Sequence, residues 1–160
     1  MNWELLNKYY ESVYVIHYKS YLILSFKDLL IMNKADYLNE LGGLILDSAI
    51  TVHRYLGPGL LESAYHLALK RELEIRGLFV KSKVTVPLFY KDIDLGKAYE
   101  IDLLVENEII IENKSTEVTH PIYTAQLITY LKLSDKKLGY LINFNVPLLK
   151  DGFKRVVNNI

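Results

Sequence analysis

The stretch Ile-Asp-Leu-Leu-Val-Glu-Asn-Glu-Ile-Ile-Ile-Glu-Asn-Lys, residues 101–114, decides the fold of this chain. Two apolar runs flank the polar residues 106–108, and a connection this short joins antiparallel strands. A turn centred on Asn107 pairs Val105 with Ile109. Because apolar residues fill both runs almost completely, the stretch predicts a central and largely buried β-hairpin.

This register brings three charged side chains to one face of the hairpin. Asp102 falls opposite Glu112, and opposed residues have Cβ atoms about 4.5–5.5 Å apart. Lys114 lies two residues beyond Glu112 and shares its face. Two close carboxylates repel each other unless a cation lies between them, and carboxylates with water suit Mg²⁺ or Mn²⁺. We therefore expect a metal at Asp102 and Glu112, with Lys114 orienting water or stabilising charge during phosphodiester hydrolysis. The alternative is an ordinary solvated strand face.

The hydrophobic spacing outside the hairpin predicts the remaining elements. Apolar residues three or four apart indicate helices, and alternation indicates strands. In chain order, we expect helices at 36–56 and 60–76, strands at 84–88, 97–105 and 108–114 with a turn at 91–94, a helix at 121–133, a strand at 138–144 and an edge strand at 154–157. This order predicts a single α/β (α+β) domain with a mixed sheet flanked by helices.

Two further patterns lie on predicted helices. Residues 59–65 fit G-x-x-E-x-x-Y, which places Glu62 and Tyr65 side by side on a helix surface. Taken alone, this pattern is better explained by an acid favoured by the helix dipole and a tyrosine in the core. On the later helix, Gln126 and Tyr130 lie one turn apart, where they can together hydrogen-bond a phosphate or a base.

Taken together, in this order and spacing, the three motifs resemble the GxxExxY family of the PD-(D/E)XK nuclease superfamily. The resemblance covers about residues 32–157 and implies a restriction-endonuclease-like fold, a Mg²⁺ (or Mn²⁺) cofactor and a nucleic-acid substrate, with DNA favoured over RNA. The residues at catalytic positions of the family pattern are Asp102, Glu112, Lys114 and Glu62, and Glu62 would lie near the metal. The residues at substrate-binding positions are Gln126, Tyr130 and Tyr65.

Three residues depart from the family pattern. Ile101 replaces the proline that precedes the aspartate, which leaves the ligands unchanged. Asn113 stands where an apolar residue is usual, and we expect its backbone carbonyl to be a further metal ligand. Glu100 adds negative charge on the face of Asp102, which indicates either a second metal or a weaker approach of DNA.

Composition limits the classes of function. With 19 basic and 19 acidic residues among 160, the chain has no global positive field that attracts nucleic acid, so binding requires a local site. The absence of cysteine excludes thiolate metal sites and cysteine nucleophiles and fits a cytoplasmic location. No apolar run reaches the roughly 20 residues that a membrane span needs, so we expect no membrane partner.

Residues 1–31 contain five of the 13 tyrosines and no catalytic motif. We interpret them as an N-terminal appendage, either a short docking helix or an extension upstream of a start at Met32, and assign residues 32–160 to the nuclease-like domain.

The leading hypothesis is therefore a metal-dependent nuclease. The alternative is a catalytically silent module with a nuclease fold that binds nucleic acid or a protein partner. A homodimer or a larger complex is left open by the sequence.

Overall fold

The computed structural model describes residues 33–158, so the predicted appendage at residues 1–31 lies outside the described part. Residues 40–160 form a compact unit that contains the sheet. No helix within residues 33–158 is long and apolar enough to cross a lipid bilayer.

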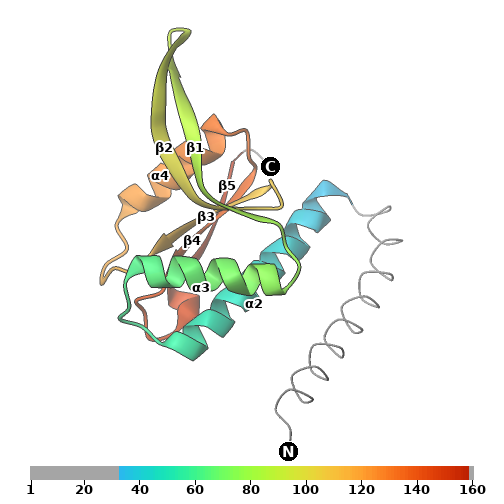
Figure 1. Cartoon of the computed structure of the whole chain (residues 1–160), viewed down its shortest axis with the longest axis vertical. Helices are drawn as coiled ribbons and strands as arrows, with labels where there is room; N and C mark the ends of the chain where they lie inside the picture. Colours follow the sequence, from blue (N-terminus) through green and yellow to red (C-terminus); the bar gives the residue numbers. More distant parts are fainter. Residues whose placement is uncertain (1–32, 159–160) are drawn as a thin grey trace, which may run out of the picture. The chain divides into compact units, whose positions relative to one another are not determined.

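The described residues contain three α-helices and a mixed sheet, arranged as drawn in Figure 1. In chain order the elements are α2 Lys34–Leu56, α3 Glu62–Ile75, β1 Val80–Tyr90, β2 Ile93–Val105, β3 Ile109–Lys114, α4 Pro121–Leu133, β4 Leu138–Asn143, the 3-10 helix η1 Leu149–Asp151, and β5 Phe153–Val157. The strand order is β1-β2-β3-β4-β5, with β3 and β4 parallel and every other neighbouring pair antiparallel. The predicted α+β domain with a restriction-endonuclease-like mixed sheet is confirmed.

The parallel pair explains why α4 lies where it does. A crossover must return the chain to the starting end of the sheet, and α4 makes this connection between β3 and β4. On its face of the sheet, α4 buries Leu127 and Leu131 against Ile110 and Leu141. At Gly139 a Cβ atom would lie 2.9 Å from Leu127 Cδ1, so glycine permits the close approach of helix and strand.

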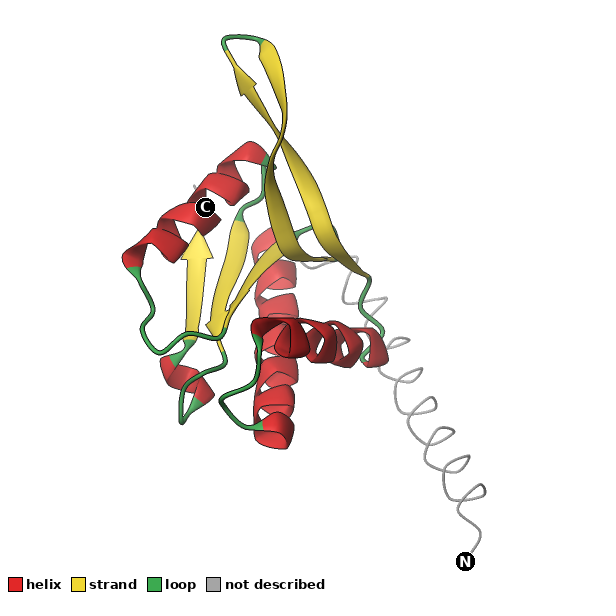
Figure 2. Cartoon of the chain, turned by 60° about the vertical axis from the view of Figure 1, so that its left-hand side comes forward, coloured by secondary structure: helices red, strands yellow, loops and turns green. Residues whose placement is uncertain are grey.

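Helix α3 and residues 40–56 of α2 cover the opposite face of the sheet (Figure 2). In α2, the glycine pair at 42–43 weakens the helical pattern in the sequence, and the structure explains Gly42: a Cβ atom there would overlap the Tyr140 hydroxyl of β4. In α3, Tyr65 is fully buried and stacks on Phe144, with ring centroids 4.7 Å apart. The site described below is contacted by α3, through Glu62, and by α4, through Tyr123.

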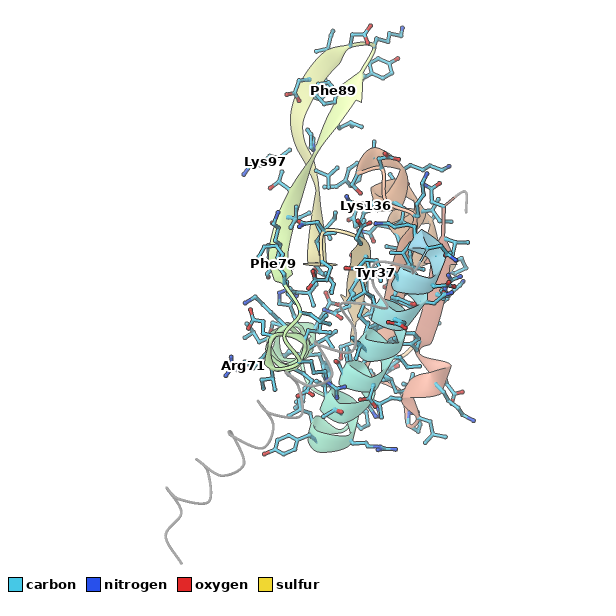
Figure 3. All side chains as sticks on the ribbon, turned by 90° about the vertical axis from the view of Figure 1, so that its right-hand side faces the viewer. Tyr37, Arg71, Phe79, Phe89, Lys97 and Lys136 are labelled. Carbon is cyan, nitrogen blue, oxygen red and sulfur yellow. The ribbon has the colours of Figure 1, made fainter. Side chains whose placement is uncertain are left out.

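The first hairpin is longer than its sequence predicts. β1 and β2 continue to Tyr90 and Ile93, and the turn is only Lys91-Asp92, rather than the expected residues 91–94. Both turn residues have positive φ, 48° and 65°, as a tight hairpin turn with right-handed strand twist requires. Beyond the main sheet this hairpin forms an arm, and Figure 3 shows Phe89 and Lys97 on it.

Candidate functional site

The β2–β3 register is the one that the sequence predicts. Val105 pairs with Ile109, and the ladder continues to Leu103 and Ile111, so Asp102 and Glu112 come next on the two strands. Both carboxylates are buried. Asp102 Oδ2 accepts a hydrogen bond from the backbone N–H of Asn113 at 3.0 Å, which fixes its side chain across the two strands.

Glu112 is only 4% exposed, and its two carboxylate oxygens differ. Oε1 accepts a hydrogen bond from Lys114 Nζ at 2.7 Å, whereas Oε2 is buried with no hydrogen-bond partner. Burial, followed by the nearby negative charge of Asp102, raises the pKa of Glu112 to about 7. A buried carboxylate oxygen without a donor is costly, so this atom is suited to bind a cation or an added proton.

Lys114 connects the strands to α3. Its ammonium lies 3.8 Å from Glu62 Oε1 as well as 2.7 Å from Glu112, and it sits 5.3 Å from the centroid of the Tyr123 ring. Burial alone lowers the pKa of Lys114, but the hydrogen bond to Glu112 and the charges of Glu112 and Glu62 outweigh it and raise the pKa. The ammonium therefore stays charged beside the buried carboxylates.

A second lysine, Lys83, belongs to the same cluster. Lys83 Nζ donates to Asp102 Oδ1 at 2.7 Å and lies 3.6 Å from Glu100 Oε1. The hydrogen bond to Asp102 is the largest cause of the raised pKa of Lys83. In the sequence, Lys83 belongs to a basic pair with Lys81 that is typical of solvated surface, so the local pattern alone does not identify its role. The pairing of β1 with β2 identifies this role, because Ser82 pairs with Leu103 and Val84 with Ile101, which places Lys83 opposite Asp102.

The α4 motif also lies near this cluster. Gln126 donates a side-chain hydrogen bond to the Tyr130 hydroxyl, and Tyr130 is buried with its ring edge-on to Tyr99. Burial is the main cause of a raised Tyr130 pKa, and the charge of Glu112 adds to it. The structure thus brings the motifs from α3, the hairpin and α4 to one region.

The comparison with protein families agrees with this arrangement. The family model of the PD-(D/E)XK nuclease superfamily matches residues 39–156. The chain belongs to the PD-(D/E)XK nuclease superfamily. Searches of the curated proteins and of the solved structures gave no significant match to this chain. The match spans all three motifs, including Asp102 and the Glu112–Lys114 segment.

Within this PD-(D/E)XK domain, Tyr65 has a structural role. Its hydroxyl donates to Gly57 O at 2.6 Å and accepts from the Leu60 N–H at 3.1 Å. Gly59 in the same loop has φ 97°, a conformation that glycine adopts readily. The first glycine and the tyrosine of G-x-x-E-x-x-Y therefore shape the loop before α3, while Glu62 is the residue of this motif that reaches the charged cluster.

A buried histidine, His66, contacts the residue that precedes Lys83 on β1. His66 Nε2 is 2.6 Å from Ser82 Oγ, and Nδ1 is buried without a partner. Burial is the main cause of the lowered pKa of His66, although the charge of Asp102 opposes it. The sequence offers no metal-ligand spacing for His66, and its side chain is buried where α3 contacts Ser82 of β1.

The donor set fits a hard divalent cation. Within residues 33–158, no group of three or more His, Asp or Glu side chains is arranged to hold a metal ion. Two buried carboxylates do converge, and Glu112 Oε2 lacks any hydrogen-bond partner. Carboxylate oxygens with waters are the ligands that Mg²⁺ prefers in proteins.

Proposed function

We propose that this protein is a metal-dependent nuclease of the GxxExxY type that hydrolyses phosphodiester bonds in nucleic acid, with DNA favoured over RNA. The observation that carries the proposal is the unpartnered, buried Glu112 Oε2 beside Asp102 in a member of a nuclease superfamily. Such an oxygen needs a cation or a proton to offset the cost of its burial.

The metal ligands in this proposal are Asp102, Glu112 and the backbone carbonyl of Asn113, with Glu62 nearby on α3. The cation is Mg²⁺ or Mn²⁺, because the side-chain donors are carboxylates. When bound, the cation lowers the pKa of a water molecule and neutralises charge on a phosphate oxygen.

Lys114 is the catalytic lysine of this proposal. Its ammonium is charged, mostly buried and held by Glu112 and Glu62. It is therefore preorganised, and little reorganisation energy is needed when the reaction takes place. It can orient the attacking water or stabilise the negative charge that develops on the phosphate. Gln126 and Tyr130 are proposed to contact the nucleic acid from α4. Tyr65, which the sequence pattern places with them, acts by holding the loop that precedes α3.

Calorimetric titration of Mn²⁺ or Mg²⁺ into the wild type and Asp102→Asn tests the proposal. We expect the wild type to bind the ion and Asp102→Asn to lose most of the binding heat, because a neutral amide is a poor ligand for a hard cation. Asp135→Asn is the matched control, since the Asp135 side chain is 94% exposed. The wild type should also cleave DNA only when the ion is present. Equal binding by the wild type and Asp102→Asn would refute the assignment of this ligand.

The alternative is a catalytically silent module that binds nucleic acid or a protein partner. The equal numbers of acidic and basic residues favour it, as does Glu100 on the approach to the cluster. A wild type that binds DNA but cleaves no single- or double-stranded substrate in Mn²⁺ would establish this alternative. We also propose a cytoplasmic location, which the absence of cysteine fits and which either function allows.

A further inference from the structure

We propose that Lys83 is a displaceable counter-ion of Asp102: it neutralises this carboxylate until a divalent cation binds there, and it then binds a phosphate of the nucleic acid. This inference rests on the proposed nuclease function. It adds a residue on β1 to a site otherwise formed by α3, β2, β3 and α4.

The charged cluster consists of two similar triplets. Lys114 contacts buried Glu112 at 2.7 Å and the more exposed Glu62 at 3.8 Å. Lys83 contacts buried Asp102 at 2.7 Å and the exposed Glu100 at 3.6 Å. Each buried carboxylate thus has its own lysine, and each lysine has a second acid at longer range.

The two lysines differ in how firmly they are held. The Lys114 side chain is 12% exposed and lies over the Tyr123 ring, whereas the Lys83 side chain is 52% exposed. An exposed lysine has a flexible four-carbon side chain and is held less firmly than a buried one. Asp102 is buried and needs a positive charge beside it, so Lys83 can leave Asp102 when another cation takes its place, while Lys114 stays beside Glu112.

The backbone at Lys83 is unusual for a strand. Its neighbours Ser82 and Val84 pair regularly with Leu103 and Ile101, yet Lys83 itself has φ 56°. Positive φ is uncommon for a residue with a side chain, and it persists only where the surrounding structure maintains it. This strain falls on the β1 residue whose side chain contacts Asp102.

Lys83 also occupies the carboxylate oxygen that a cation would use. Asp102 Oδ2 accepts from the Asn113 N–H, and Oδ1 accepts from Lys83 Nζ. A divalent cation at Oδ1 would repel an ammonium at hydrogen-bond distance from the same atom. Metal binding at Asp102 therefore favours release of Lys83. Glu100 keeps the released ammonium near the site. A nucleic-acid substrate brings phosphate anions there, and the ammonium can bind one of them.

Two titrations test the proposal with Lys83→Met, which keeps the length of the side chain and removes its charge. The first measures Mn²⁺ binding by calorimetry. We expect Lys83→Met to bind Mn²⁺ on the order of tenfold more tightly than the wild type, because the competing cation is gone. Lys83→Arg should remain near the wild type. Lys81→Met is the matched control, since Lys81 lies on the same strand as Lys83 and its ammonium lies near the ring of Phe79 instead of the carboxylates. Equal or weaker Mn²⁺ binding by Lys83→Met overturns the proposal.

The second titration measures binding of a fluorescein-labelled DNA duplex in Mn²⁺ by fluorescence anisotropy. Lys114→Ala is the common background, which prevents cleavage during the measurement. Adding Lys83→Met should weaken DNA binding several-fold, and adding Lys81→Met should weaken it less. Unchanged DNA affinity would overturn the phosphate-binding role of Lys83. A wild type that does not bind Mn²⁺ would instead contradict the proposed nuclease function. Failure of the Lys83 proposal and failure of the nuclease proposal are therefore distinguishable.

Discussion

Lys114 Nζ donates a hydrogen bond to Glu112 Oε1 at 2.7 Å, across two residues of the same strand. Alternate residues of a strand share one face, so this contact follows directly from the spacing Glu-x-Lys. The ammonium offsets only part of the cost of burying Glu112, whose pKa is still raised to about 7. Both the catalytic and the pH-dependent behaviour of the protein should depend on this pair.

Lys114→Ala should abolish cleavage of DNA while leaving Mn²⁺ binding and the fold largely intact. The reason is that the lysine is proposed to act on water or on the transition state, and not as a metal ligand. Cleavage of a labelled duplex in Mn²⁺ measures the first effect, and calorimetry measures the second. Lys132→Ala, at an exposed position of α4, is the control and should retain activity. Equal activity of the wild type and Lys114→Ala would mean that a contaminating nuclease produces the cleavage.

Glu112 should make the metal-free protein less stable as the pH rises. Its pKa is about 7 in the folded chain against an ordinary value of 4.5, so between these two values the folded state holds a proton that the unfolded state has lost. The free energy of unfolding therefore falls across this window and levels off above it. Glu112→Gln lacks this titration and should be more stable than the wild type at pH 8, by about 1–3 kcal/mol.

Thermal unfolding in a chelating buffer from pH 5 to pH 8 measures this difference. The gap between Glu112→Gln and the wild type should widen with pH and then stay constant. A gap that does not change with pH would show that the carboxylate titrates at its ordinary value, and would remove the argument that its burial favours a cation.

The sequence predicts the β2–β3 hairpin in the correct register because its connection is very short. With only three polar residues between two apolar runs, Val105 has to pair with Ile109, and one confirmed pair fixes the relative positions of Asp102 and Glu112. The parallel order of β3 and β4 likewise follows from the helix between them.

The role of Lys83 cannot be predicted in the same way. Extrapolated from the Tyr90–Ile93 pair at the turn, a regular ladder would place Lys83 opposite Glu100. The ladder is irregular on both sides of Pro87, which lacks a backbone N–H, and these two shifts move Lys83 opposite Asp102. Bulges of this kind depend on packing across the sheet, which no local pattern in the sequence encodes.

Tyr65→Phe should lower stability without a selective loss of nucleic-acid binding. The change removes the hydroxyl that bonds to Gly57 O and the Leu60 N–H, and lost hydrogen bonds of this kind cost about 1–3 kcal/mol. Chemical unfolding monitored by circular dichroism measures the change. Tyr55→Phe is the control, because Tyr55 is 89% exposed and this substitution should leave the stability unchanged. Weaker DNA binding at unchanged stability would instead indicate that Tyr65 contacts the substrate.

A shortened chain that begins at Met32 should keep the fold and the metal affinity of the full chain. The family match begins at residue 39, all three motifs follow it, and the compact unit that contains the sheet comprises residues 40–160. The shortened chain also retains all of α2, which begins at Lys34 and buries Leu41 and Ile45. Residues 1–31 are nevertheless rich in tyrosine and leucine, and removal of a segment that covers an apolar patch promotes aggregation. Melting temperature and Mn²⁺ affinity should therefore be compared between the two chains. Similar values would support the interpretation of residues 1–31 as an appendage. Insolubility or a large fall in melting temperature would show that residues 1–31 belong to the domain.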